Sequence, residues 1–207
     1  MPKWWYGFSR IHSALRALTS DDHPQYRDYW QKTVAGRYFN GTHSVGQTSA
    51  QALAKNGVYF FPIYFGNPSA VDAIALSINT AVPGATLNLA AYLDDGTFNA
   101  PGARLASLGS ISAATTGVKQ VVFGSVVFGT GTFFWMAVSC DNTGVLFDAT
   151  ATEAWAPYGC DSPTTPTFAS CLSDTGSVFT GTWELDASNY SLSYDSATYP
   201  MLFLRGA

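Results

Sequence analysis

The feature that most constrains the fold is a succession of short β-type runs that begins after residue 40. Each run is β-branched or aromatic, or alternates apolar with polar residues, and Gly, Pro, Asn or Asp separates it from the next. The predicted strands are 57–65, 70–79, 86–93, 104–108, 117–128, 132–139, 145–148 and 199–204. Gaps of roughly 8–12 residues with no long helical period favour an antiparallel sandwich over a parallel α/β sheet.

The pattern weakens between residues 149 and 197. This stretch contains two cysteines, three prolines, Trp155 and Trp183, and many Ser and Thr residues. A long loop within a compact domain is more often functional or interfacial than idle. We therefore predict a loop excursion between the last two strands of the sandwich.

Residues 1–40 differ in kind from the rest of the chain. They carry six basic and three acidic side chains, a balance of +3, whereas residues 41–207 carry four basic and eleven acidic ones, a balance of −7. Phosphate binding needs clustered cations, so we expect no nucleic-acid partner and no anionic membrane surface. Only 12% of all residues are charged, about half the usual share, which suits an extracellular β protein or an obligate oligomer.

A short helix is predicted over residues 9–18, where Ile11, Leu15 and Leu18 recur at helical spacing. Polar residues 19–22 interrupt it, and Pro24 prevents its renewal. A helix of about ten residues is marginal on its own. It therefore needs partners, and identical copies of itself are the simplest ones.

The three cysteines, Cys140, Cys160 and Cys171, cannot all pair within one chain. The sequence leaves open whether Cys160 and Cys171 form a disulfide. The sequence has no CxxC pair and its histidines lie far from the cysteines, so we expect no zinc, no other metal and no cofactor. It has no signal-peptide core and no run of about 20 apolar residues, so we expect synthesis in a cytoplasm and no membrane insertion.

The most specific signal lies in residues 12–26, which read His-Ser-Ala-Leu-Arg-Ala-Leu-Thr-Ser-Asp-Asp-His-Pro-Gln-Tyr. This segment resembles a motif that recurs in the tail-fibre and virion-fibre proteins of tailed bacteriophages, at joints where three chains wind together. The resemblance implies a homotrimer. The residues that would carry it are His12, Leu15, Leu18, Asp21, Asp22, His23, Pro24, Gln25 and Tyr26.

The residue types in this motif suit a threefold joint. Leu15 and Leu18 would meet their symmetry mates on the axis, and the two aspartates that follow would pair with Arg16 of a neighbouring chain. One alternative is a monomeric helix followed by a turn. Another, less favoured, is a metal ion bound on the axis by the two histidines.

Upstream of the motif, Trp4, Trp5, Tyr6 and Phe8 place four aromatic side chains in five positions. Exposed to water, they would favour aggregation. They would dock on another virion protein, of capsid, portal or tail, or pack beneath the chain's own trimer. Residues 27–38 lead almost directly into the β region, unlike longer fibres that continue with a shaft, so we expect a short knob.

The β region resembles the jelly-roll heads at the C-termini of phage fibres, which are similar to carbohydrate-binding modules. The shared types include a strand ending in Tyr and an Asp-rich turn, a Pro-Gly corner before a Leu, and a strand closing on Phe-Trp. They lie in residues 57–62, 71–79, 88–96, 101–105, 116–119, 132–138 and 200–205. The two resemblances imply a helical and extended segment for virion attachment and trimerisation, 1–40, followed by an antiparallel jelly-roll β-sandwich head, 41–207.

The sequence offers little for catalysis, so we expect no enzyme and assign no catalytic residue. A glycosidase needs two carboxylates across one cleft. Asp94 and Asp95 are adjacent in a predicted turn, where Ca²⁺ ligation is a minor alternative. The acidic residues of the irregular stretch, Glu153, Glu184 and Asp186, have no spacing that brings them together. There is no GxSxG motif and no histidine after His43, which disfavours a Ser/His/Asp triad.

Glycan binding needs less: an exposed aromatic face and a few amide or carboxylate partners. The irregular stretch supplies aromatic residues where loop-borne binding residues are expected. The candidates are Trp155, Tyr158, Trp183, Tyr190 and Tyr194. Each of them would otherwise pack in the core or in a trimer interface.

We therefore expect a homotrimeric fibre or spike that is assembled in the host cytoplasm, exposed on the surface of a tailed-phage virion, and bound to host-surface glycan. The first alternative is a capsid or tail decoration protein with no receptor of its own. A polysaccharide-degrading enzyme is the less favoured second alternative.

Overall fold

The computed structural model describes residues 35–40, 49–65, 69–96, 100–128, 132–149, 171–176, 178–195 and 200–207. The chain divides into two compact units, Met1–Lys32 and Thr33–Ala207, and every described residue belongs to the second. The predicted helix, the trimerisation motif and the aromatic docking residues lie outside the described residues. The strand at Tyr38–Asn40 pairs with the strand at Phe203–Gly206, so it belongs to the β-sandwich unit.

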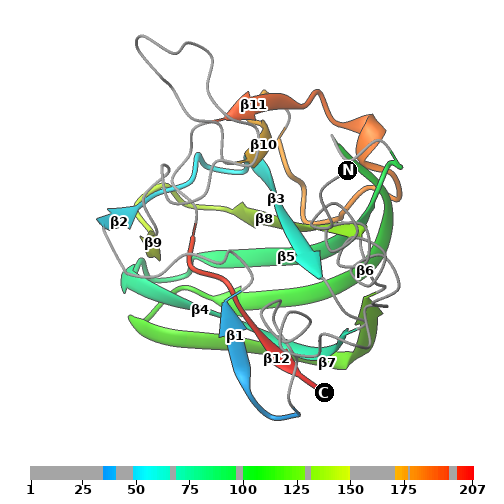
Figure 1. Cartoon of the computed structure of the whole chain (residues 1–207). Helices are drawn as coiled ribbons and strands as arrows, with labels where there is room; N and C mark the ends of the chain where they lie inside the picture. The colour runs from blue at the N-terminus through cyan, green and yellow to red at the C-terminus, as the bar shows by residue number, and fades with distance from the viewer. Residues whose placement is uncertain are drawn as a thin grey trace, which may run out of the picture. The chain divides into compact units, whose positions relative to one another are not determined.

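The described strands form two antiparallel sheets (Figure 1). The first sheet contains β1 (Tyr38–Asn40), β2 (Ser49–Gln51), β4 (Ser69–Thr80), β7 (Gly117–Phe128), β9 (Leu146–Ala149) and β12 (Phe203–Gly206). The second contains β3 (Val58–Phe65), β5 (Thr86–Asp94), β6 (Pro101–Ser112), β8 (Thr132–Cys140), β10 (Cys171–Asp174) and β11 (Ser193–Asp195). A short 3-10 helix, η2 (Ala187–Asn189), lies between the last two strands of the second sheet.

The strand order is that of a jelly roll. In the first sheet β2, β9, β4 and β7 are successive neighbours, and in the second β3, β8, β5 and β6 are. From β2 to β9 the chain changes sheet at every step except the β5–β6 hairpin, as two interlocked Greek keys require. The predicted antiparallel jelly-roll sandwich is confirmed.

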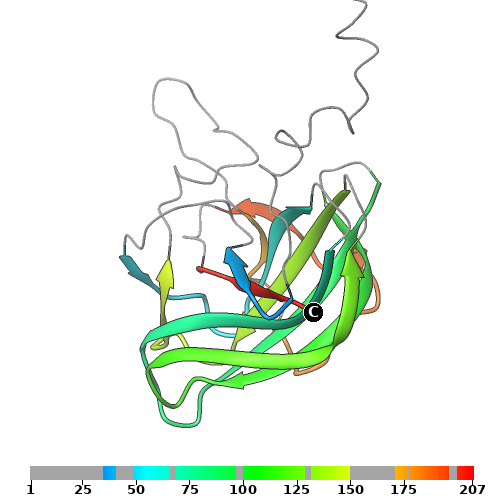
Figure 2. The ribbon, with the colours of Figure 1, turned by 60° about the horizontal axis from the view of Figure 1, so that its bottom comes forward.

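Strand β4 organises the first sheet. It pairs with β7 along one edge over Ser69–Ile78. A strand has only two edges, so its other partners must follow one another along the opposite edge, where β12 pairs with Val71–Ala75 and β9 pairs with Ile78 and Thr80. Figure 2 shows β4 and β7 as two long strands running side by side. Among the described strands, β7 therefore lies at the outer margin of this sheet.

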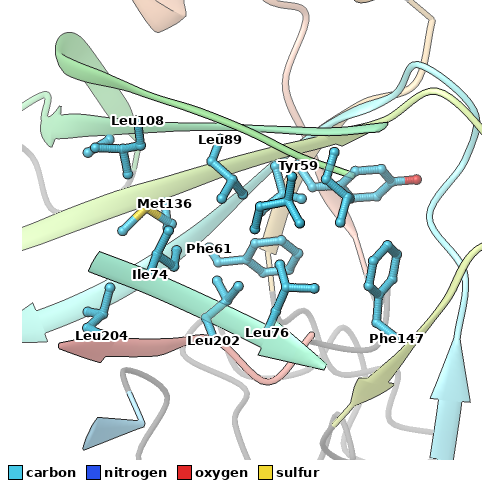
Figure 3. Close-up of a cluster of buried hydrophobic side chains, with 14 of the residues drawn as sticks. Tyr59, Phe61, Ile74, Leu76, Leu89, Leu108, Met136, Phe147, Leu202 and Leu204 are labelled. Atoms are coloured by element: carbon cyan, nitrogen blue, oxygen red, sulfur yellow. The ribbon is translucent and has the colours of Figure 1, made fainter. Parts of the chain in front are cut away.

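The main core lies between the two sheets (Figure 3). Ile74 and Leu76 of β4 point towards Phe61, Leu89 and other side chains of the second sheet. These positions recur with the two-residue period of a strand. The same alternation of apolar and polar residues predicted these strands from the sequence.

A second core covers the outer face of the second sheet. It contains the alternate residues of the central strands: Val58 and Phe60 of β3, Ala90 and Tyr92 of β5, Trp135 and Ala137 of β8, and Leu172 of β10. Residues 178–192, here called the cover segment, lie over them and contribute Phe179, Trp183 and Ala187. In Figure 1 this segment is the orange chain that leaves β10, passes β6 and returns to β11.

The prediction of a loop excursion over 149–197 was therefore wrong in part. This stretch contains β10 and β11, which extend the second sheet beyond β3, and the cover segment, which is part of a core. The two strands have only four and three residues, too few for an alternating pattern to stand out. Cys171 in β10 is buried, with its Sγ 3.8 Å from the carbonyl oxygen of Asp195, whereas Cys160 lies outside the described residues.

One ion pair joins the C-terminal strand β12 to β4. Arg205 donates from Nε to Asp72 Oδ1 at 2.7 Å and from Nη2 to Oδ2 at 3.0 Å. The hydrogen bonds from Arg205 hold the pKa of Asp72 below its ordinary value of 3.8. A lowered pKa in the folded state means that the ionised carboxylate stabilises the fold, and that this contribution is lost as the pH falls through the lowered pKa.

We predict that Asp72→Asn destabilises the protein near neutral pH and that the difference from wild type shrinks as the pH falls below 3.8, the ordinary pKa of the group. Urea unfolding over a pH series measures this difference. As a control, Asp72→Asn is introduced into an Arg205→Gln background, and the stability difference between the double variant and Arg205→Gln alone should show no such pH dependence. A difference that stays constant into acid would contradict the prediction.

Candidate functional site

A pocket of about 640 Å³ opens where the β5–β6 hairpin meets the cover segment. Its volume is within the range of small-ligand sites. Its polar wall contains Asp94 and Asp95 at the end of β5, and Asp186 and Ser188 at η2, and Tyr190 adds an aromatic ring. The other lining residues are Leu93, Ala100, Pro101, Gly102, Ala103, Ala187 and Leu192.

Asp94 is fixed by two hydrogen bonds. Its Oδ2 accepts from the backbone N–H of Gly96 at 2.9 Å, and its Oδ1 accepts from Nε1 of the buried Trp135 at 3.1 Å. Gly96 has φ of +89°, a conformation that a turn glycine adopts without strain. The carboxylate is thus held between the turn and the second core.

Asp95 and the Pro-Gly corner face each other across the hairpin. A Cβ at Gly102 would lie 3.1 Å from the Cα of Asp95, so this close approach of the two strands favours glycine. The N–H of Asp95 donates to the carbonyl of Ala100 at 3.0 Å. Asp95 itself is exposed and stands at the pocket mouth.

Asp186 brings the third carboxylate to the pocket. It caps η2, with Oδ1 accepting from the N–H of Ser188 at 2.8 Å, and this hydrogen bond holds its pKa below the ordinary value. An isolated bridge pairs Asp186 with Ala103 of β6. The carboxylate is therefore ionised over the whole neutral range, and its backbone is fixed to the hairpin.

The cover segment is attached to the sheet through its own backbone. The Tyr92 hydroxyl donates to the carbonyl of Glu184 at 2.7 Å, and the N–H of Glu184 donates to the Tyr190 hydroxyl at 3.1 Å. Arg104 of β6 binds the carbonyl of Trp183 through Nη1, and its N–H donates to Leu185 at 2.8 Å. These bonds make the pocket wall a fixed surface.

The predicted aromatic candidates have different positions. Trp183 is 4% exposed, with its ring centroid 4.5 Å from that of Phe179, so it packs in the second core and offers no face to a ligand. Tyr190 is half-buried and lines the pocket. Tyr194 is 64% exposed on β11 and does not line it. Trp155 and Tyr158 lie outside the described residues.

The sequence did not identify the pocket as a site. The sequence places Asp94 and Asp95 in a turn. In the structure Asp94 is the last residue of β5, Asp95 follows it, and the Pro-Gly corner begins β6. The way in which this hairpin meets η2 depends on a contact between residues about 90 positions apart in the chain. The signal in the sequence was a pair of carboxylates on one side of a hairpin turn and a Pro-Gly corner on the other.

Comparison with models of known protein families, and with curated protein sequences, gives no match. Within the described residues, no three or more His, Cys, Asp or Glu side chains are grouped to hold a metal ion. The same part of the chain has no helix long and apolar enough to cross a membrane. The described wall of the pocket offers a ligand carboxylates, an aromatic ring and apolar side chains.

We predict that Trp183→Ala destabilises the protein by about 3–5 kcal/mol, because it empties the centre of the second core. Val178→Ala, at a 68% exposed position of the same segment, should change stability by less than about 0.5 kcal/mol. Both values come from chemical denaturation followed by tryptophan fluorescence. Equal stability of the two variants would show that the cover segment is not part of the folded core.

Proposed function

We propose that this chain is a homotrimeric fibre or spike subunit of a tailed-phage virion whose jelly-roll head binds a host-surface glycan in the pocket between the β5–β6 hairpin and η2. The observation that carries the binding proposal is the set of three carboxylates, Asp94, Asp95 and Asp186, beside Tyr190 in one pocket of ligand size. The proposal of a trimeric virion protein is supported by the resemblance of residues 12–26 to the fibre motif.

The pocket chemistry suits a sugar. Carboxylates accept hydrogen bonds from hydroxyl groups, and such charge-assisted bonds are roughly twice as strong as neutral ones. The Tyr190 ring and the aliphatic wall at Leu93 and Leu192 match the CH faces of a pyranose. The described lining residues include three Asp and no Lys or Arg, so an anionic sugar would be repelled. We therefore propose a neutral or amino sugar as the ligand.

We predict that Asp95→Ala weakens glycan binding by roughly 10- to 100-fold, as expected for loss of a hydrogen bond to a charged group. Asp95 is exposed, so the variant should fold normally. Asp148→Ala on β9 of the first sheet, where the half-buried carboxylate accepts from Asn79 Nδ2 at 3.3 Å, is a control away from the pocket that should bind like wild type. An array of neutral and amino-sugar oligosaccharides, probed with the full-length protein, gives the measurement.

The array also separates the alternatives. Binding that survives Asp95→Ala but is lost in Trp155→Ala would move the glycan site to the irregular stretch. No binding by wild type, together with fragile particles when the chain is deleted, would favour the decoration protein. Of the two alternatives, the burial of Trp183 favours the decoration protein over the enzyme, because it removes one aromatic face from the surface. Release of reducing ends from host polysaccharide would reveal an enzyme.

We predict a mass of three times 22.1 kDa for the full-length chain in solution by light scattering. Leu15→Glu together with Leu18→Glu should dissociate this trimer, because three copies of each charge would meet at the axis. Val178→Glu, at a 68% exposed position of the cover segment, is the control. A monomeric wild-type protein would refute the homotrimer.

A further inference from the structure

The outer face of the first sheet carries a row of exposed valines. Val118, Val122 and Val127 of β7 are 75%, 62% and 68% exposed. The intervening Val121 and Val126 pack against the core between the sheets. Side chains alternate along a strand, and the shift of register against β4 between Val122 and Val126 changes the phase of this alternation, so all three exposed valines point outward.

Two cross-strand rows extend this surface over β4 and β12. They are Val122–Ala73–Arg205 and Gln120–Ala75–Phe203. The two alanines are only 0% and 2% exposed, and each lies between larger residues of the neighbouring strands. Tyr38 of β1 donates its hydroxyl to Gln120 Oε1 at 2.6 Å and so spans the rows. Together, the three valines and the two rows form what is here called the valine face.

The charge on this face is balanced. Arg205 is the charged member of the rows, and it is paired in bidentate fashion with Asp72. When identical copies of one face meet around a symmetry axis, like charges are brought together and repel. Because Arg205 is neutralised by Asp72, contact between copies of the valine face brings no net charge of one sign together.

Strand β7, which carries the exposed valines, has the features of a strand that packs against another protein surface. β7 is 12 residues long, pairs with β4 along one edge, and contains no proline. Its single charged residue, Lys119, hydrogen-bonds through Nζ to Thr115 Oγ1. A long marginal strand with exposed β-branched residues promotes aggregation unless another surface covers it. A closed ring of identical copies provides such a cover without leaving an open end.

We propose that the valine face is where the heads of the trimer contact one another, so that its occupant is a second copy of this chain. This inference rests on the homotrimer proposed above. In that trimer residues 12–26 of three chains lie together, and the eight residues 27–34 that lead to Ala35 reach at most about 30 Å. Ala35 bridges Gly206 in the first sheet, so the tether ends in the sheet that bears the valine face.

The test uses the full-length chain with Val122→Lys, Val127→Lys and, as matched control, Val178→Lys. Val178 lies on the cover segment over the other sheet and is 68% exposed, as Val127 is. Light scattering over a dilution series gives the concentration at which the trimer half dissociates. We expect this concentration to rise about tenfold or more for the first two variants, because desolvated valines are replaced by repelling charges, and to be unchanged for the control.

The outcomes separate this inference from the homotrimer itself. If wild type is trimeric and all three variants dissociate alike, the valine face is not the interface and the homotrimer stands. If wild type is monomeric at every concentration, both proposals fall. Should either Lys variant fail to fold, Val122→Thr keeps the β-branched shape. If the circular dichroism spectrum of Val122→Thr matches that of wild type, we expect this variant to weaken the trimer too. A trimer as tight as that of wild type would overturn the inference.

Discussion

The central strands of the second sheet are buried on both faces, and most of the architecture follows from this constraint. In β3, Tyr59 and Phe61 point into the core between the sheets, whereas Val58 and Phe60 point away from it, and all four are at most 4% exposed. A strand of this kind needs a layer on each side. The first sheet is one layer and the cover segment is the other, and the pocket lies where the edge of that cover meets the β5–β6 hairpin.

Few residues of the chain are charged, and two of them, Asp174 and Arg104, hold the cover segment in place. Asp174 is 2% exposed, yet its carboxylate accepts from the N–H groups of Gly176 and Ser191, each at 3.0 Å. Burial of a carboxylate without such donors would cost several kcal/mol. Arg104 fastens the other side of the cover to β6. The polar groups thus hold the backbone of the segment in place while Phe179 and Trp183 fill the space beneath it.

The sequence predicted the long strands well because their core positions alternate in plain view. The interval 117–128 coincides with β7, and 86–93 differs from β5 by one residue. Strand β6 is longer than predicted because its ends are Pro-Gly-Ala and Gly-Ser, types that are rare in strands. Gly109, with φ of +104°, lies at a shift of register against β5. A bulge of this kind interrupts the pattern that sequence reasoning follows.

The site was harder to predict because it depends on which distant segments meet. Trp183 and Tyr190 are both aromatic residues of one irregular stretch, and nothing in their spacing shows that one is buried and the other lines a pocket. That difference depends on contacts between distant segments, such as the hydrogen bond from the Tyr92 hydroxyl to the carbonyl of Glu184, 92 positions away. Propensity and period are local properties, so they carry no information on such a contact.

The pairing of β1 with β12 also bears on how the domain folds. β12 lies between β1 and β4, and its ion pair to β4 joins residues 133 positions apart. Leu202 and Leu204 at this strand are fully buried, so the core stays open to water until they arrive. Closing such large loops costs entropy before any contact compensates for it, and domains dominated by distant pairings fold in milliseconds to seconds. The first sheet therefore cannot be completed strand by strand during synthesis, and β1 must wait unpaired until nearly the whole domain has been made.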